Sequence, residues 1–147
     1  MHPGRDIQYF SYREAGKIAS ALTEPLQNNE PLNVIGHSFG GREAIRQANV
    51  TSAKVTNLIT IDPVGRAGNG AKPSNVAEWT NITASPSPSD RNSSDTIASV
   101  GRTLFGTTNT SGADISKTST TNHAEFPQMM SQLGSEKKID SSYRQKP

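Results

Sequence analysis

The apolar residues of this chain gather in a few short runs within its first 84 positions. PLNVIGH, residues 31–37, is one compact run, and KVTNLITID, residues 54–62, is a second that stops at Pro63. Proline cannot donate a hydrogen bond to a neighbouring strand, so the second strand should end there. VAEWTNITA, residues 76–84, predicts a further strand. DIQYFSY, residues 6–12, has the aromatic and β-branched composition of another.

Helical patterns separate these apolar runs. Apolar residues in REAGKIASALTEPLQ recur at three- and four-residue intervals between Ala15 and Leu22, which predicts one apolar stripe on a helix that Pro25 ends or bends. GREAIRQA, residues 41–48, also has helical composition with an apolar side. Strands that alternate with short helices predict an α/β fold with a mostly parallel sheet. In such sheets the functional groups gather at the carboxyl ends of the strands.

The carboxyl half of the chain has a different composition. From Ser85 onward it is rich in Ser, Thr, Asn, Pro and Gly, with short apolar patches at 97–105 and 113–115. We therefore expect residues 85–120 to be mostly loop, with a fifth strand if residues 113–116 pair with the sheet. Met129 and its neighbour are expected to pack in the core. At 147 residues, the chain predicts a single domain over 1–147.

Composition excludes several classes of function. The chain has no cysteine, and its net charge of +2 comes from basic residues that are spread along the chain, so nucleic acid or an anionic membrane is not an expected partner. The three histidines show no paired spacing, and we expect no metal site and no cofactor. No apolar run approaches the roughly 18 residues of a membrane span, and the amino terminus lacks the pattern of an export signal. These features predict a soluble chain, whose compartment stays open.

A serine lies between two glycines where the first apolar run ends. Gly36-His37-Ser38-Phe39-Gly40 follows a predicted strand and precedes a predicted helix, which is the arrangement of a nucleophile elbow. Small residues are expected at Gly36 and Gly40 because the backbone there passes close to neighbouring elements. The N–H of Phe39 would face a substrate carbonyl oxygen at the positive end of the helix dipole, and so would form half of an oxyanion hole.

A serine nucleophile needs a base, and histidine is the usual one. His2 lies near the terminus and His37 lies inside the elbow, where it should point away from the serine hydroxyl. Elimination leaves His123, which follows the serine in the order that this kind of site requires. The imidazole in turn needs a carboxylate.

Three aspartates are candidates for that carboxylate. Asp62 ends an apolar strand and so should emerge at the same sheet edge as Ser38. Asp90 and Asp95 follow the next strand and could reach the same histidine from a loop, and Asp62 could instead serve only as a turn residue before proline. The glycine-rich GRAGNG, residues 65–70, lacks the ending of a phosphate-binding loop and is expected to be a flexible loop near the site.

These residues resemble the α/β-hydrolase superfamily, and specifically its lipase-like serine esterases. NVIGHSFGGREAI is similar to the lipase form of the elbow, and LITIDPVG is similar to the stretch in which the triad acid of pancreatic-type lipases lies. The resemblance covers residues 7–64 best. It implies that Ser38 is the nucleophile, Asp62 the acid and His123 the base, in the hydrolysis of a small-molecule or lipid ester without a cofactor.

The chain also departs from this family. The family fold has about eight strands, whereas the sequence predicts four or five. The strands that are missing would precede Asp6, together with the turn that donates the second oxyanion N–H; His2-Pro3-Gly4 is the nearest candidate for a remnant of that turn. An alternative interpretation is a truncated, non-catalytic hydrolase-like fold that acts as a binding module or is part of a larger protein. The oligomeric state stays open.

Overall fold

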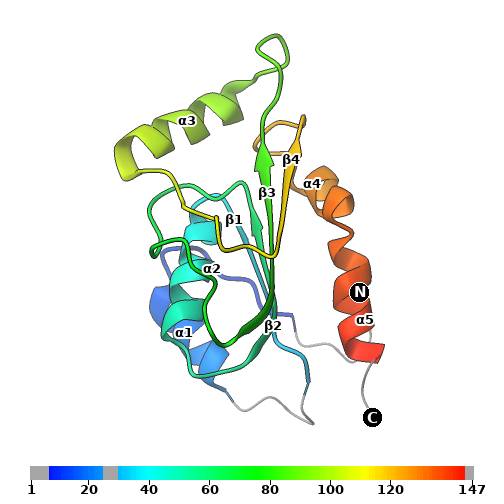
Figure 1. Ribbon diagram of the computed structural model, residues 1–147. Helices are drawn as coiled ribbons and strands as arrows, with labels where there is room; N and C mark the ends of the chain where they lie inside the picture. The colour runs from blue at the N-terminus through cyan, green and yellow to red at the C-terminus, as the bar shows by residue number, and fades with distance from the viewer. Residues whose placement is uncertain (1–6, 25–29, 145–147) are drawn as a thin grey trace.

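A four-stranded parallel sheet organises the part of the chain that the computed structural model describes, residues 7–24 and 30–144 (Figure 1). The strands lie in chain order, β1-β2-β3-β4. Their bounds are β1 Asn33–His37, β2 Val55–Ile61, β3 Val76–Ala84 and β4 Ile115–Ser119. The first three agree with the strands predicted from the apolar runs, and the α/β prediction with a parallel sheet is confirmed.

Helices lie on both faces of the sheet. Their bounds are α1 Ala15–Thr23, α2 Phe39–Val50, α3 Ser93–Phe105, α4 Phe126–Leu133 and α5 Ser135–Arg144. In Figure 1, α2 covers one face with α1 outside it, while α4 and α5 lie against the other face. The remaining helix, α3, lies beyond the end of β3, at the carboxyl edge of the sheet. Among the described residues, no helix combines the length and the apolar character needed to cross a lipid bilayer.

Alternate residues of the strands build two apolar cores. Leu58 and Trp79 pack with residues of α2, whereas Ile59 and Ile82 pack with residues of α4. The first core contains Ala44, Ile45, Ala48, Val55, Leu58, Ala67, Val76 and Trp79; the second contains Ile59, Ile61, Ile82, Met129, Met130 and Leu133. The central strand β2 is the most completely buried and the most apolar, as is usual for a strand that is covered on both faces. The predicted core role of Met129 is confirmed.

The register of the sheet brings two loops to one edge. His37, the last residue of β1, pairs with Ile61, the last residue of β2. Because the strands are parallel, the residues that follow them leave the sheet side by side. Ser38 and Asp62 are those residues, and the N–H of Ser38 donates a hydrogen bond to the carbonyl of Ile61 at 3.0 Å.

The strand predicted at residues 6–12 is wrong. Residues 7–10 have no regular secondary structure, and Tyr9 is 89% exposed; residue 6 lies outside the described residues. One of the aromatic residues of this segment, Tyr12, instead packs against Phe39, with ring centroids 5.3 Å apart. The helix predicted next in the chain is confirmed by α1, while Pro25 lies outside the described residues.

The prediction that residues 85–120 are mostly loop is wrong over Ser93–Phe105, which form α3. Asn92 caps α3 through a capping box, in which its side chain accepts from the first turn while Asp95 accepts from the N–H of Asn92. Strand β4 extends the sheet beside β3, although its side chains are mostly polar and exposed. The paired strand predicted around 113–116 is confirmed, displaced toward Ser119. Helix capping at α3 and backbone pairing at β4 therefore stabilise regular structure in a segment whose sequence has no apolar pattern.

Candidate active site

Ser38 stands in the sharp turn between β1 and α2. Its backbone has φ 57° and ψ −127°, a conformation that costs a residue with a side chain of the order of 1–3 kcal/mol. Hydrogen bonds hold the turn, since the Ser38 carbonyl accepts from the N–H groups of Gly41 and Val64, each at 3.0 Å. This geometry lifts the serine hydroxyl above the sheet edge, as in a nucleophile elbow.

The glycines around Ser38 differ in how closely they are packed. A Cβ at Gly36 would lie 2.3 Å from the carbonyl oxygen of Gly40, so the expected close approach is confirmed there. At Gly40 the expectation is wrong, because a Cβ would meet no atom within 4 Å. The second tight position is Gly41, where a Cβ would lie 2.9 Å from the Cβ of Pro63. Helix α2 therefore approaches the Asp62-Pro63 turn at Gly41.

His123 connects the serine to a carboxylate. Its Nε2 lies 3.0 Å from Ser38 Oγ and its Nδ1 lies 2.5 Å from Asp62 Oδ2. A carboxylate can only accept, so Nδ1 carries the proton and Nε2 is left to accept from the serine hydroxyl. Side chains that are 61 and 85 residues from His123 in the sequence thus form one hydrogen-bonded chain.

Asp62 is the most enclosed member of this chain. Its side chain is 1% exposed, and its φ of 40° is one that aspartate tolerates better than most residues do. The other carboxylate oxygen, Oδ1, accepts from Arg102 Nη2 at 2.6 Å and from the N–H of Ala84 at 3.0 Å. Burial raises the pKa of Asp62, but the hydrogen bond with His123, the charge and hydrogen bond of Arg102 and the Ala84 N–H outweigh it and hold that pKa below its usual value.

The two rival aspartates have other contacts. Asp95 Oδ1 accepts from the backbone N–H of His123 at 2.8 Å, and its Oδ2 caps α3. The Asp90 carboxylate accepts from the hydroxyl groups of Ser87 and Ser89 in the preceding loop. Of the three candidates, Asp62 is the one whose carboxylate meets the imidazole ring.

His37 occupies a supporting position that the sequence did not indicate. Its Nε2 donates to the carbonyl of His123 at 2.7 Å, and the two rings lie 4.7 Å apart between centroids. Burial lowers the pKa of His37 and outweighs the opposing effect of that hydrogen bond. The sequence argument excluded this histidine as the base, and the engagement of its Nε2 by the His123 carbonyl agrees with that. The contact itself had no signal in the sequence, because it joins residues 86 positions apart. His2 lies outside the described residues.

Aromatic side chains surround the residue that follows the serine. Phe39 begins α2, so its N–H has no intrahelical acceptor. Its ring lies 5.3 Å from the ring of Phe105 on α3 and 5.3 Å from that of Tyr12. The Arg42 guanidinium stacks on it from α2. The candidate second donor at His2-Pro3-Gly4 lies outside the described residues.

The glycine-rich loop leaves the same sheet edge. The N–H groups of Gly65 and Arg66 donate to the carbonyls of Gly106 and Phe105, each at 3.0 Å, and the Thr108 hydroxyl donates to the Gly65 carbonyl. These contacts join the loop that follows Asp62 to the end of α3. The loop thus lies near the site, as predicted.

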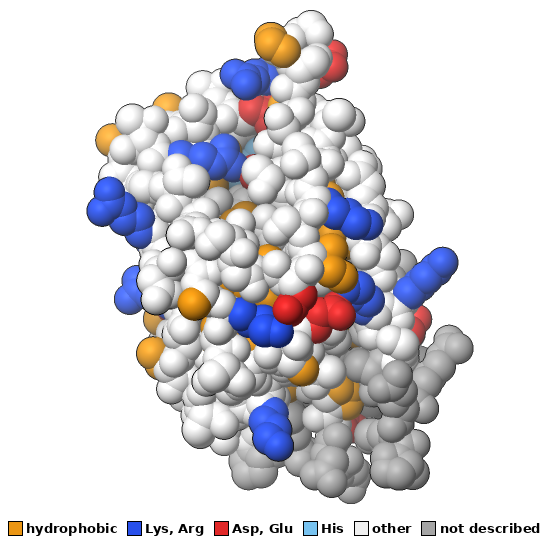
Figure 2. Space-filling view, viewed as in Figure 1, with side chains coloured by type: hydrophobic (Ala, Val, Ile, Leu, Met, Phe, Trp, Pro, Cys, Tyr) orange, Lys and Arg blue, Asp and Glu red, His pale blue; other side chains and the backbone are white. Residues whose placement is uncertain are grey.

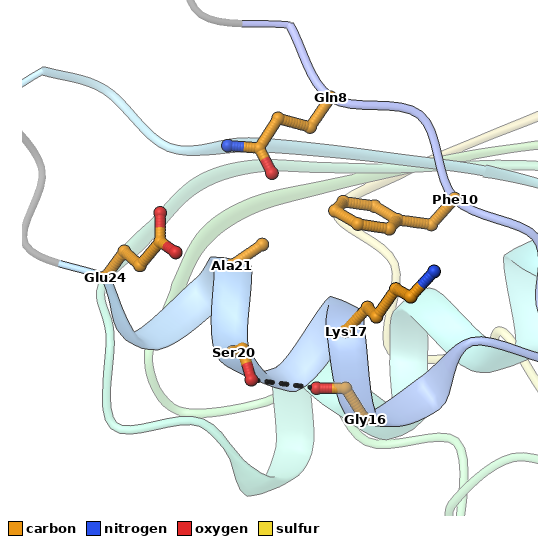
Figure 3. Close-up of a pocket in the computed structure, with 7 residues that line it drawn as sticks. All are labelled: Gln8, Phe10, Gly16, Lys17, Ser20, Ala21 and Glu24. Carbon is orange, nitrogen blue, oxygen red and sulfur yellow. Dashed lines mark hydrogen bonds between the residues drawn. The ribbon is translucent and has the colours of Figure 1, made fainter.

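A separate open hollow lies between the amino-terminal segment and α1 (Figure 3). Gln8 and Phe10 form one wall, and residues from Gly16 to Glu24 form the other. None of its lining residues belongs to the hydrogen-bonded chain described above. In the described part of the chain, no group of three or more His, Asp or Glu side chains could hold a metal ion. On the face seen in Figure 2, basic side chains are scattered among polar ones.

No protein-family model matches this chain, and no curated protein is significantly similar to it.

Proposed function

We propose that this protein is a serine hydrolase of the α/β-hydrolase type that cleaves carboxylic esters, in the manner of lipases and esterases. One observation carries the proposal: Ser38 Oγ, His123 and Asp62 form a continuous hydrogen-bonded chain at the carboxyl edge of a parallel sheet. The strained backbone of Ser38 supports it, since strain of this kind clusters at active sites.

In this proposal Ser38 Oγ attacks the acyl carbon while its proton passes to His123 Nε2. Asp62 stabilises the imidazolium that forms, through the hydrogen bond at Nδ1. The imidazolium then gives its proton to the departing alkoxide as the ester C–O bond breaks, and the acyl group stays on Ser38. Water attacks the acyl-enzyme with His123 again as base, which releases the acid and restores the serine.

The negative charge of the tetrahedral intermediate would develop beside the start of α2. The Phe39 N–H is a donor at that place, and the helix dipole favours an anion there. One such donor typically contributes about 10²–10³ in rate. A second donor would have to come from outside the contacts described above.

The aromatic group formed by Tyr12, Phe39 and Phe105 favours an ester with an apolar acyl chain. It begins at the residue next to the nucleophile, and Phe105 is 54% exposed. In this proposal an acyl chain on Ser38 buries apolar surface against these rings, which contributes about 25 cal/mol for each Å² removed from water.

Hydrolysis of a series of p-nitrophenyl esters, from acetate to octanoate, tests the proposal. Wild type should hydrolyse them, and Ser38→Ala should lose hydrolysis while keeping its circular dichroism spectrum. Ser52→Ala, at an exposed serine in the loop after α2, is the matched control and should keep wild-type rates. Activity that survives in Ser38→Ala would overturn the proposal. A folded wild type that hydrolyses none of the series would favour the alternative of a non-catalytic binding module.

A further inference from the structure

Helix α3 turns its charged residues inward and its apolar residues outward. Asp95 and Arg102 are seven residues apart, which is two helical turns, so they lie on one face, and both contact the site. The opposite face is apolar and exposed, at Ile97 (69%), Val100 (51%) and Leu104 (69%). An ordinary surface helix has the reverse arrangement. The inward face of α3 is therefore suited to electrostatic contact with the site.

Arg102 makes the closer of these two contacts. Its Nη2 lies 2.6 Å from Asp62 Oδ1, while its side chain is 26% exposed and that of Asp62 is 1% exposed. A charge-assisted hydrogen bond to a buried carboxylate fixes both its orientation and its charge. Because the other oxygen of the same carboxylate faces His123 Nδ1, Arg102 and His123 compete for one negative charge.

We infer that Arg102 is a positioning residue for the triad: its guanidinium fixes the Asp62 carboxylate and offsets part of the charge that this carboxylate presents to His123. Arg102 thereby sets how much of the Asp62 charge is available to the imidazolium that forms when His123 accepts the Ser38 proton. The catalytic meaning of this inference rests on the proposed function. The electrostatic effect itself does not, because the contacts among Arg102, Asp62 and His123 do not depend on whether an ester is cleaved.

The direction of the effect follows from the signs of the charges. The negative charge of Asp62 favours the protonated imidazole, and the positive charge of Arg102 disfavours it. Two other titratable groups face His123: Asp95, on its backbone N–H, and His37, against its ring and carbonyl. Neither of these groups is altered in a variant at Arg102. Removal of the guanidinium charge should therefore strengthen the attraction between the Asp62 carboxylate and a protonated His123.

The test compares variants at Arg102 that remove its charge with one that keeps it. Arg102→Gln and Arg102→Met remove the charge, and methionine also keeps most of the aliphatic stem. Arg102→Lys keeps the charge. Arg46→Gln, at an exposed arginine on α2, is the matched control. The His123 ring signal, assigned by its absence in His123→Ala, is followed by NMR as a function of pH. The pH profile of kcat/KM for a p-nitrophenyl ester and the melting temperature are measured on the same samples.

The inference predicts that in Arg102→Gln and Arg102→Met the midpoint of the His123 signal and the acid limb of kcat/KM both move to higher pH than in wild type. Arg102→Lys and Arg46→Gln should follow the wild-type curves. A lower melting temperature with an unmoved midpoint would overturn the inference, since Arg102 would then only hold α3 in place. A moved midpoint in a protein that cleaves no ester would support the effect of Arg102 on His123 and refute the proposed function instead.

Discussion

Replacement of Gly36 with alanine should disable the site without removing any group that takes part in the chemistry. The new Cβ would lie 2.3 Å from the carbonyl oxygen of Gly40 and 2.7 Å from the Cα of Gly41, and both are backbone atoms of the elbow. Carbon and oxygen atoms that are not bonded stay about 3.0 Å apart or more, so the strand and the start of α2 must separate by about 0.7 Å. Ser38 lies between them and has to move with them.

The magnitude of the loss follows from that displacement. A misplacement of about 1 Å in a catalytic group costs about 10²-fold in rate, and we expect kcat for ester hydrolysis to fall by about that factor. Overpacking in a closely packed region costs about 1–3 kcal/mol, so the free energy of unfolding should fall by the same amount.

Gly40→Ala is the matched control for this prediction. It makes the same chemical change in the same turn, but its Cβ would meet no atom within 4 Å. Alanine is favoured over glycine within a helix by up to about 1 kcal/mol, so this variant should be at least as stable as wild type and should keep its activity within a few-fold. Urea denaturation and steady-state hydrolysis of a p-nitrophenyl ester, measured on both variants, give the comparison. If Gly36→Ala is as active and as stable as Gly40→Ala, the close packing that we assign to the elbow is refuted.

Three further predictions concern Ser38 and the carboxylates of the site. Asp62→Asn should lower kcat by about 10⁴-fold, because the amide cannot stabilise the imidazolium, whereas Asp95→Asn should cost less than tenfold; a larger loss at Asp95 would reassign the acid. The free energy of unfolding of Ser38→Gly, measured in urea, should exceed that of Ser38→Ala by about 1 kcal/mol, because glycine tolerates the φ of 57° at this position. Equal free energies of unfolding would mean that the turn holds no strain. The pKa of Asp62 is held below its ordinary value of 3.8, so its pairing stabilises the folded protein above that pH and the stabilisation is lost as the pH falls through the lower folded-state pKa. The free energy of unfolding of wild type should therefore approach that of Asp62→Asn as the pH is lowered from 6 to 2. A difference that stays constant over this range would contradict the pairing.

The sequence predicted the strands that carry buried apolar side chains and missed structure that is held by polar contacts. The runs that became β1, β2 and β3 each supply apolar residues to the cores under the helices, so composition located them. Strand β4 reads ISKTS, and α3 exposes Ile97 and Leu104, so neither has the hydrophobic period of a buried element. At residues 7–10, aromatic side chains suggested a strand, but the segment pairs with no strand among the described residues.

The residues of the candidate site also fall into those that the sequence located and those that it did not. Ser38 and Asp62 could be placed from sequence because each follows an apolar strand directly, and parallel strands release such residues at one edge. His123 was found by elimination among three histidines. Arg102 could not have been found, because no pattern marks an arginine in a polar stretch as the partner of a carboxylate 40 residues earlier. The packing at Gly41 in place of Gly40 likewise depends on where Pro63 lies in three dimensions.

The measurement that tests the central claim most directly is labelling of the purified protein with a fluorophosphonate, which reacts with a serine only where that serine is activated. Wild type, Ser38→Ala and His123→Ala are compared at equal concentration, and the labelled peptide is identified by mass spectrometry. The account predicts stoichiometric label on Ser38 in wild type and none in either variant. A folded wild type that stays unlabelled, or a label that persists in Ser38→Ala, would contradict it.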